Sequence, residues 1–88
     1  MTMNKKVPTF TNSSARDAVA ITPNDGADLA KYPTKGIYVG VAGDIRVDLI
    51  DGTAPVTFKD VSKGSIFPVA VKRVYATGTT ATDIVGVY

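Results

Sequence analysis

The 88-residue sequence contains no Cys, His, Glu, Gln or Trp. Without Cys it can form neither a disulfide nor a thiolate metal site, and without His it lacks the commonest metal ligand and the side chain best suited to proton transfer near neutral pH. A nucleophilic Ser would need an unusual Lys or Asp base, and nothing in the sequence indicates one. We therefore predict that the protein is not an enzyme and has no catalytic residue, cofactor or metal site.

Long apolar runs and strong charge are also missing. Ten basic residues against eight acidic ones give a net charge of +2, too weak a bias to indicate a nucleic-acid partner. No apolar run approaches the roughly 20 residues of a membrane span, and Met1–Lys6 leads into polar sequence rather than the apolar stretch of a signal peptide. We expect a soluble protein, made in the cytoplasm, with no membrane partner and no nucleic-acid partner.

The chain length allows one small domain with a small core. A domain of this size buries only about 60 to 65 % of the surface that its unfolded chain exposes, so its own core stabilises it only marginally. With no disulfide and no metal, contacts between subunits remain as a source of stability. The length therefore favours a homo-oligomer.

Helix-favouring residues are scarce, whereas Val, Ile and Thr recur throughout. Leu occurs only at Leu29 and Leu49. Short β-like runs separated by turn residues predict about six strands, at residues 18–21, 37–41, 45–49, 56–58, 66–77 and 84–88. The predicted fold class is all-β, a small antiparallel β-barrel or sandwich, with a loop over residues 27–35.

Turn residues predict how some strands connect. Ala42-Gly43-Asp44 and Asp51-Gly52 favour tight reversals, so residues 36–59 are predicted to form a three-stranded meander. Within residues 66–77 the apolar parity changes after Val71, which predicts a β-bulge at Lys72-Arg73.

The alternation in residues 45–49 predicts which side chains are buried. Arg46 and Asp48 should face solvent or another subunit. Val47 and Leu49, on the opposite face, should face a core shared with Val39, Phe58 and Val71.

Residues 1–16 form the predicted N-terminal arm, and residues 17–88 the β domain. Besides two Met residues, Val7 and Phe10 are the only large apolar side chains of the arm, too few for a core. Fully extended, the arm could reach about 50 Å, far enough to contact a neighbouring subunit. A disordered terminus is the alternative.

Three groups of residues are candidates for functional sites. Asp44, Asp48 and Asp51 are close in sequence, but their spacing lacks the Gly and terminal Glu of a calcium loop, so a solvated hairpin is favoured. The glycines at 36, 40 and 43 do not follow a strand and open a helix, which favours turn or packing roles over a phosphate cradle. The segment Gly78–Thr82 has several hydroxyls, but an exposed turn is favoured.

Aromatic and basic residues give one further possibility. Lys72-Arg73 with Tyr75 could form a small patch for stacking and phosphate contact, although a bulge with solvated charges is the favoured interpretation. Tyr38, Tyr75 and Tyr88 are predicted to lie in the wall of the domain, with their phenol ends toward water or a neighbouring subunit.

Most of residues 17–88 resembles one known family, in segments 17–23, 37–44, 66–74, 76–82 and 84–88. The most distinctive are Tyr-Val-Gly-x-Ala-Gly-Asp at residues 38–44 and Ala-Thr-Gly-Thr-Thr-Ala-Thr at residues 76–82. They resemble the head spike base proteins of tailed phages and phage-like gene transfer agents. The resemblance implies a structural virion protein on the capsid surface, at five-fold vertices, that anchors a spike or fibre for host-surface attachment.

The same resemblance implies the partners. They are further copies of the chain, with a pentamer favoured, the major capsid protein, and a spike or fibre protein. Two other function classes stay open: a nucleic-acid-binding small β-barrel, and a carbohydrate-binding adhesin domain. The absence of Trp and the few aromatic residues argue mildly against an adhesin.

Overall fold

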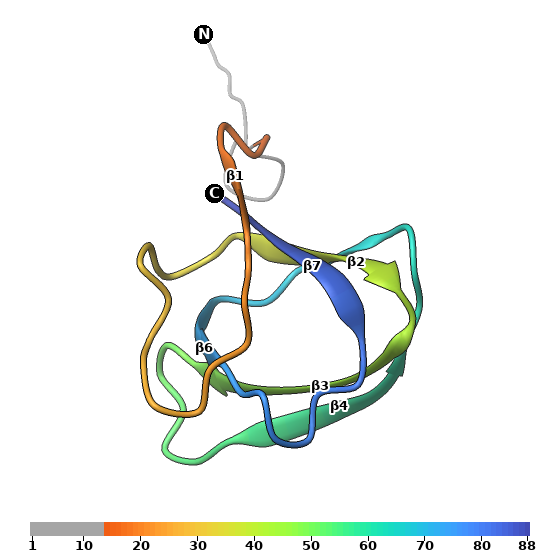
Figure 1. The fold of residues 1–88 in the computed structure, drawn as a ribbon. Coiled ribbons are helices and arrows are strands. Elements are labelled where there is room, and N and C mark those ends of the chain that lie inside the picture. The colour runs from red at the N-terminus through yellow and green to blue at the C-terminus, as the bar shows by residue number, and fades with distance from the viewer. Residues whose placement is uncertain (1–13) are drawn as a thin grey trace, which may run out of the picture.

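The structure is a computed structural model that describes residues 14–88 and contains seven strands in two antiparallel sheets (Figure 1). The larger sheet has the order β1-β7-β2-β5, formed by Ala18–Ala20, Thr82–Val87, Gly36–Val41 and Ile66–Phe67. The smaller sheet has the order β4-β3-β6, formed by Val56–Val61, Gly43–Leu49 and Val71–Val74. The all-β sandwich prediction is confirmed, and the described strands do not close into a barrel.

Residues 14–88 contain no helix, and thus none that could cross a membrane. The predicted strand over residues 66–77 is divided into β5 and β6, which belong to different sheets. Of the predicted arm, only Ser14–Arg16 is described, so the division at residue 16 stays a prediction.

The predicted three-stranded meander over residues 36–59 is wrong, because β2 and β3 belong to different sheets. β2 pairs with β7 and β5, whereas β3 pairs with β4 and β6. Only the β3–β4 hairpin of the meander is present. At Ala42-Gly43-Asp44 the chain crosses from one sheet to the other, and the Asp44 amide and carbonyl bond to Thr80 and Ala81 rather than across a hairpin.

The bulge predicted at Lys72-Arg73 is confirmed. Asp48 lies opposite Arg73 and Leu49 lies opposite Val71, so Lys72 is the extra residue on β6. The extra residue explains why Val71 and Val74 are both buried although they are three positions apart.

A loop replaces a strand along the outer edge of β6. The backbone N–H groups of Asn24, Leu29 and Thr34 donate to carbonyls of β6 at 2.8, 2.8 and 3.3 Å. The hydroxyl of the buried Thr34 donates to Val69 O at 2.7 Å and accepts from Val71 N at 3.1 Å. These bonds satisfy an edge that would otherwise be open to pairing with another chain.

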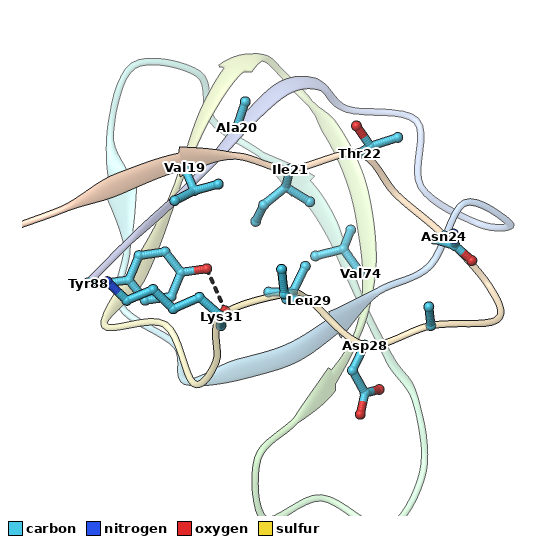
Figure 2. A pocket seen from close by; sticks show the side chains of 12 residues that line it. Val19, Ala20, Ile21, Thr22, Asn24, Asp28, Leu29, Lys31, Val74 and Tyr88 are labelled. Atoms are coloured by element: carbon cyan, nitrogen blue, oxygen red, sulfur yellow. Dashed lines mark hydrogen bonds between the residues drawn. The ribbon is translucent and has the colours of Figure 1, made fainter.

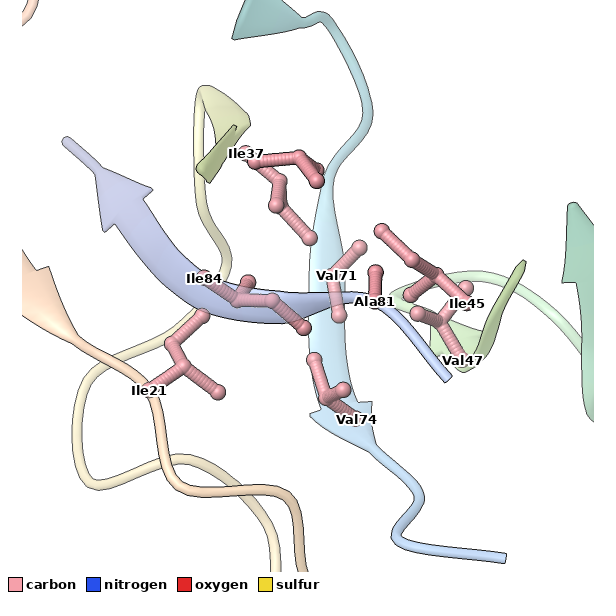
Figure 3. Packing of buried hydrophobic residues seen from close by; sticks show 9 residues of the cluster. Ile21, Ile37, Ile45, Val47, Val71, Val74, Ala81 and Ile84 are labelled. Atoms are coloured by element: carbon pink, nitrogen blue, oxygen red, sulfur yellow. The ribbon is translucent and has the colours of Figure 1, made fainter. Parts of the chain in front are cut away.

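The core between the sheets consists of small and β-branched side chains (Figure 3). Its members are Ile21, Ile37, Val39, Ile45, Val47, Val71, Val74, Ala81 and Ile84. The predictions for Val39, Val47 and Val71 are confirmed.

Leu49 and Phe58 pack against this core, as predicted, but both side chains are only partly buried. Leu49 comes directly after the register shift at the end of β3, where the regular alternation stops. Phe58 lies on the edge strand β4 and meets Phe67 of the other sheet edge to face, with 4.7 Å between ring centroids. This pair bridges the two sheets at their β4–β5 side.

Candidate functional site

The basic and aromatic residues singled out in the sequence lie on the outer face of the smaller sheet. The Arg73 guanidinium donates from Nε to Asp28 Oδ1 at 2.9 Å and from Nη1 to Asp25 O at 3.1 Å. The hydrogen bond to Asp28 raises the pKa of Arg73. Arg73 therefore ties β6 to the loop that covers it, and its charge is already paired.

The Tyr75 side chain also makes its contacts on the outer face of the smaller sheet. Its hydroxyl donates to Asp48 Oδ2 at 2.7 Å, and the guanidinium carbons of Arg46 and Arg73 lie 4.9 and 5.7 Å from its ring centroid. The hydrogen bond to Asp48 is the main reason why the pKa of Tyr75 is raised. Of the patch that would support nucleic-acid binding, Arg73 and Tyr75 are thus engaged in contacts within the chain.

This hydrogen bond gives a prediction about alkaline pH. Because the folded-state pKa of Tyr75 is raised, its stabilising contribution is present below the ordinary tyrosine pKa and is lost as the pH rises through the folded value. We expect Asp48→Ala to shift the Tyr75 ionisation to lower pH, measured by tyrosinate absorbance. Asp51→Ala, on the exposed end of the same hairpin, is the control and should leave the titration unchanged.

The three acidic residues considered for calcium have separate surroundings. Asp44 accepts from Asp60 N at 2.9 Å and lies 3.5 Å from Lys59 Nζ, whereas Asp48 binds Tyr75 and Asp51 is exposed. In the part of the chain that the structure describes, no group of three acidic side chains could hold a metal ion.

The hydroxyls of the Gly78–Thr82 turn bind the chain's own backbone. Thr80 Oγ1 accepts from Asp44 N at 2.8 Å, and Thr79 Oγ1 accepts from Arg46 N at 3.0 Å. Beside the turn, Thr77 donates to both carboxylate oxygens of Asp25, which lowers the pKa of Asp25. These hydroxyls hold the turn against β3 and the 24–28 loop.

A hollow of about 240 Å³ lies between β1 and the loop at residues 27–31 (Figure 2). Its apolar lining includes Val19, Ile21, Leu29 and Val74. At its rim, Tyr88 and Lys31 contact each other and Asp17.

The rim contacts come from three separate segments. Tyr88 donates its hydroxyl to Lys31 O at 2.7 Å, and Lys31 Nζ lies 4.7 Å from the Tyr88 ring centroid and 2.8 Å from Asp17 Oδ2. The hydrogen bond to Lys31 lowers the pKa of Asp17. This cluster could not be predicted from the sequence because no local pattern relates its three members.

The outer face of the larger sheet is apolar, in contrast to the charged outer face of the smaller sheet. Direct cross-strand pairs place Ala20, Val85, Tyr38 and Ile66 in one row across all four strands, and Ala18, Val87 and Gly36 in the next. A Cβ on Gly36 would meet the side chains of Ile66 and Val87, which confirms that these three positions share a side. We call this surface the apolar face; its side chains are Ala18, Ala20, Tyr38, Ile66, Val85 and Val87.

A comparison with solved structures relates the chain to a protein of a phage-like particle. No protein-family model and no curated protein sequence matches the chain. A solved structure described as the capsid of a native gene transfer agent particle, computed with C5 symmetry, contains a chain that is 39% identical to this one. The match covers 86% of each chain with a TM-score of 0.75.

Proposed function

This chain belongs to the same family as the protein matched in the gene transfer agent capsid, and we propose that it is the base on which a spike or fibre is mounted on a phage-like particle. The chain is a structural protein of a phage-like particle. The observation that carries this conclusion is the 39% identity across 86% of both chains at a TM-score of 0.75, because sequence and fold agree over the same span.

The proposed location is the capsid surface at five-fold vertices. The C5 symmetry used for the related capsid supports a pentamer of this chain, seated on the major capsid protein and carrying a spike or fibre protein for host attachment. In a cyclic ring each contact joins two different patches of neighbouring subunits. The sandwich suits that arrangement, since its two outer faces differ in chemistry.

The proposed role is assembly and not catalysis. The polar side chains gathered on the smaller sheet, Asp48, Arg73 and Tyr75, are engaged in contacts within the chain. Their contacts fasten loops to strands, which suits a rigid mounting block.

The absence of Cys allows a direct test of location. Thr57→Cys would place the chain's single thiol at an exposed position of β4. After coupling to a gold label and incorporation into particles, we expect electron microscopy to show label outside the capsid at its vertices. The unsubstituted chain, treated identically, should remain unlabelled.

Two outcomes would contradict the proposal. Purified particles that exclude the chain would refute a structural role in the virion. Label spread evenly over the capsid would refute the vertex location.

A further inference from the structure

We propose that the apolar face is covered by a second copy of this chain, and that the segment Val7–Phe10 of that copy lies on it. The inference deepens the proposed function and rests on it, because it names the contact that would join neighbouring subunits of the ring. It concerns association of the chain with itself and can be tested without particles.

The apolar face is uncharged in both of its rows, and part of it is strongly exposed. Ile66 and Tyr38, which are direct cross-strand partners, are 54% and 37% exposed, whereas Val87 is 8% exposed. The small side chains Ala18 and Ala20 are exposed on β1, at the opposite edge of the sheet from Ile66. Large exposed apolar side chains grouped with small ones on one sheet are typical of a surface that another polypeptide covers.

Strand β7 shows the same feature in its sequence. Ile84 lies in the core and Gly86 faces Ile21 and Thr34 beneath the sheet, whereas Val85 and Val87 lie on the apolar face. Apolar residues on both sides are typical of strands buried on both faces, whereas a strand with one wet face alternates. β3 alternates in that way, with Arg46 and Asp48 outward.

The covering segment is assigned from the sequence that precedes the described residues. Among residues 14–88, the core cluster runs from Ile21 to Ile84, and its most central members are 0 to 1% exposed. Val7 and Phe10 lie outside the described residues. They are the large apolar residues of the part of the chain that precedes Ser14, together with the two Met residues.

The start of the described chain supports contact with a neighbour. Arg16 N donates to Tyr88 O at 2.6 Å, and Lys35 Nζ donates to Ser14 O at 3.1 Å, so the chain enters at the end of the larger sheet. From Ser14 to Val7 an extended chain reaches about 23 Å, which exceeds the roughly 14 Å width of four strands. A segment that leaves at the end of one sheet is long enough to cross the face of the next.

Symmetry and charge agree with this assignment. An arm and a face are different patches, so repetition of their contact can close a ring, whereas two apolar faces packed on each other would give only a pair. At the far end of the face Asp83 lies beside Gly40 and is exposed, and Lys5 and Lys6 precede Val7. Attraction between these opposite charges would favour the orientation of the arm in which Lys5 and Lys6 lie near Asp83.

The test uses two full-length variants and their mixture. The arm variant combines Val7→Asp with Phe10→Asp, and the face variant combines Tyr38→Asp with Ile66→Asp. Both carry the same added charge, so mixing creates no new attraction between altered surfaces. We expect light scattering to show a ring for the unsubstituted chain, monomers for each variant alone, and a 1:1 heterodimer for the mixture, since one intact arm then meets one intact face.

Thr57→Asp, on the charged outer face, is the matched control and should keep the mass of the unsubstituted chain. Circular dichroism checks the fold, and Tyr38→Ser with Ile66→Ser replaces the face variant if the charged version unfolds. A mixture that stays monomeric, a variant that keeps the ring mass, or an unsubstituted chain that is monomeric at high concentration would overturn the inference. Failure of the proposed function is separate, because it would appear as absence of the chain from particles.

Discussion

Replacing Ile37 by Ala is expected to lower the free energy of unfolding by about 2 to 5 kcal/mol, the range for truncating a fully buried Ile. Ile37 is 0% exposed on the inner side of β2, where its cross-strand neighbours are Gly86 and Phe67. Gly86 has no side chain that could move into the space, so the cavity should persist. A small domain has a total stability of only about 4 to 13 kcal/mol, so this loss is a large part of it.

The measurement is urea unfolding at a concentration where light scattering shows single chains. In a domain of this size, each kcal/mol lost lowers the melting temperature by roughly 4 to 8 °C. Ile66→Ala is the control with the same change of side chain, at a position 54% exposed, and should cost much less. Equal effects of the two substitutions would mean that the inner and outer sides of β2 and β5 have been assigned wrongly.

Local patterns were enough to predict the features that depend on neighbouring residues. The many β-branched residues indicate an all-β fold, and the change of apolar parity after Val71 predicts the bulge at Lys72-Arg73, where the structure has it. Both properties are encoded by residues within one or two strands. They are therefore visible without knowledge of which strands pair.

The connection between β2 and β3 could not be predicted in that way. Gly43 and Asp44 suit a tight hairpin and a crossing between sheets equally well, because both need a small residue where the chain changes direction. What decides the outcome is the turn at Thr79–Ala81, about 36 residues further along, which binds the backbone of Asp44 and Arg46. The sequence shows these threonines but not what they contact.

The candidate surfaces were only partly predictable for the same reason. The sequence indicates Arg73 and Tyr75 as members of a possible patch, but their partners Asp28 and Asp48 come from other segments of the chain. The apolar face did have a signal, since Ile84–Val87 is apolar at both parities without an intervening polar residue. That signal indicates cover on both sides of the strand, but only the sheet order shows which residues join Val85 on the outer side.

Replacing Gly43 by Ala should be the most damaging single change outside the core, with an expected loss of about 2 to 4 kcal/mol of unfolding free energy. A Cβ at this position would lie 2.6 Å from Ala81 N, 2.7 Å from Thr80 Oγ1 and 2.9 Å from Ala81 Cα. Two of these atoms are backbone, so the clash cannot be relieved by rotating a side chain. The crossing and the turn must move apart.

That movement also weakens the hydrogen bonds that join the two segments. Asp44 O accepts from Thr80 N at 2.8 Å and from Ala81 N at 3.2 Å, and Asp44 N donates to Thr80 Oγ1 at 2.8 Å. Gly26→Ala is the control with the same change, because the nearest atom to its added Cβ is 3.6 Å away. It should change the stability by no more than about 0.5 kcal/mol, as expected for a surface substitution.

A double-mutant cycle separates this mechanism from a general loss of stability. Thr80→Val alone removes the hydroxyl that accepts from Asp44 N, and should cost about 1 kcal/mol or somewhat more. In the Gly43→Ala background that hydrogen bond is already strained or broken, so the second substitution should cost much less than it does alone. Fully additive losses would mean that Gly43 and Thr80 act independently, and that the contact between the crossing and the turn does not hold the two sheets together at this corner.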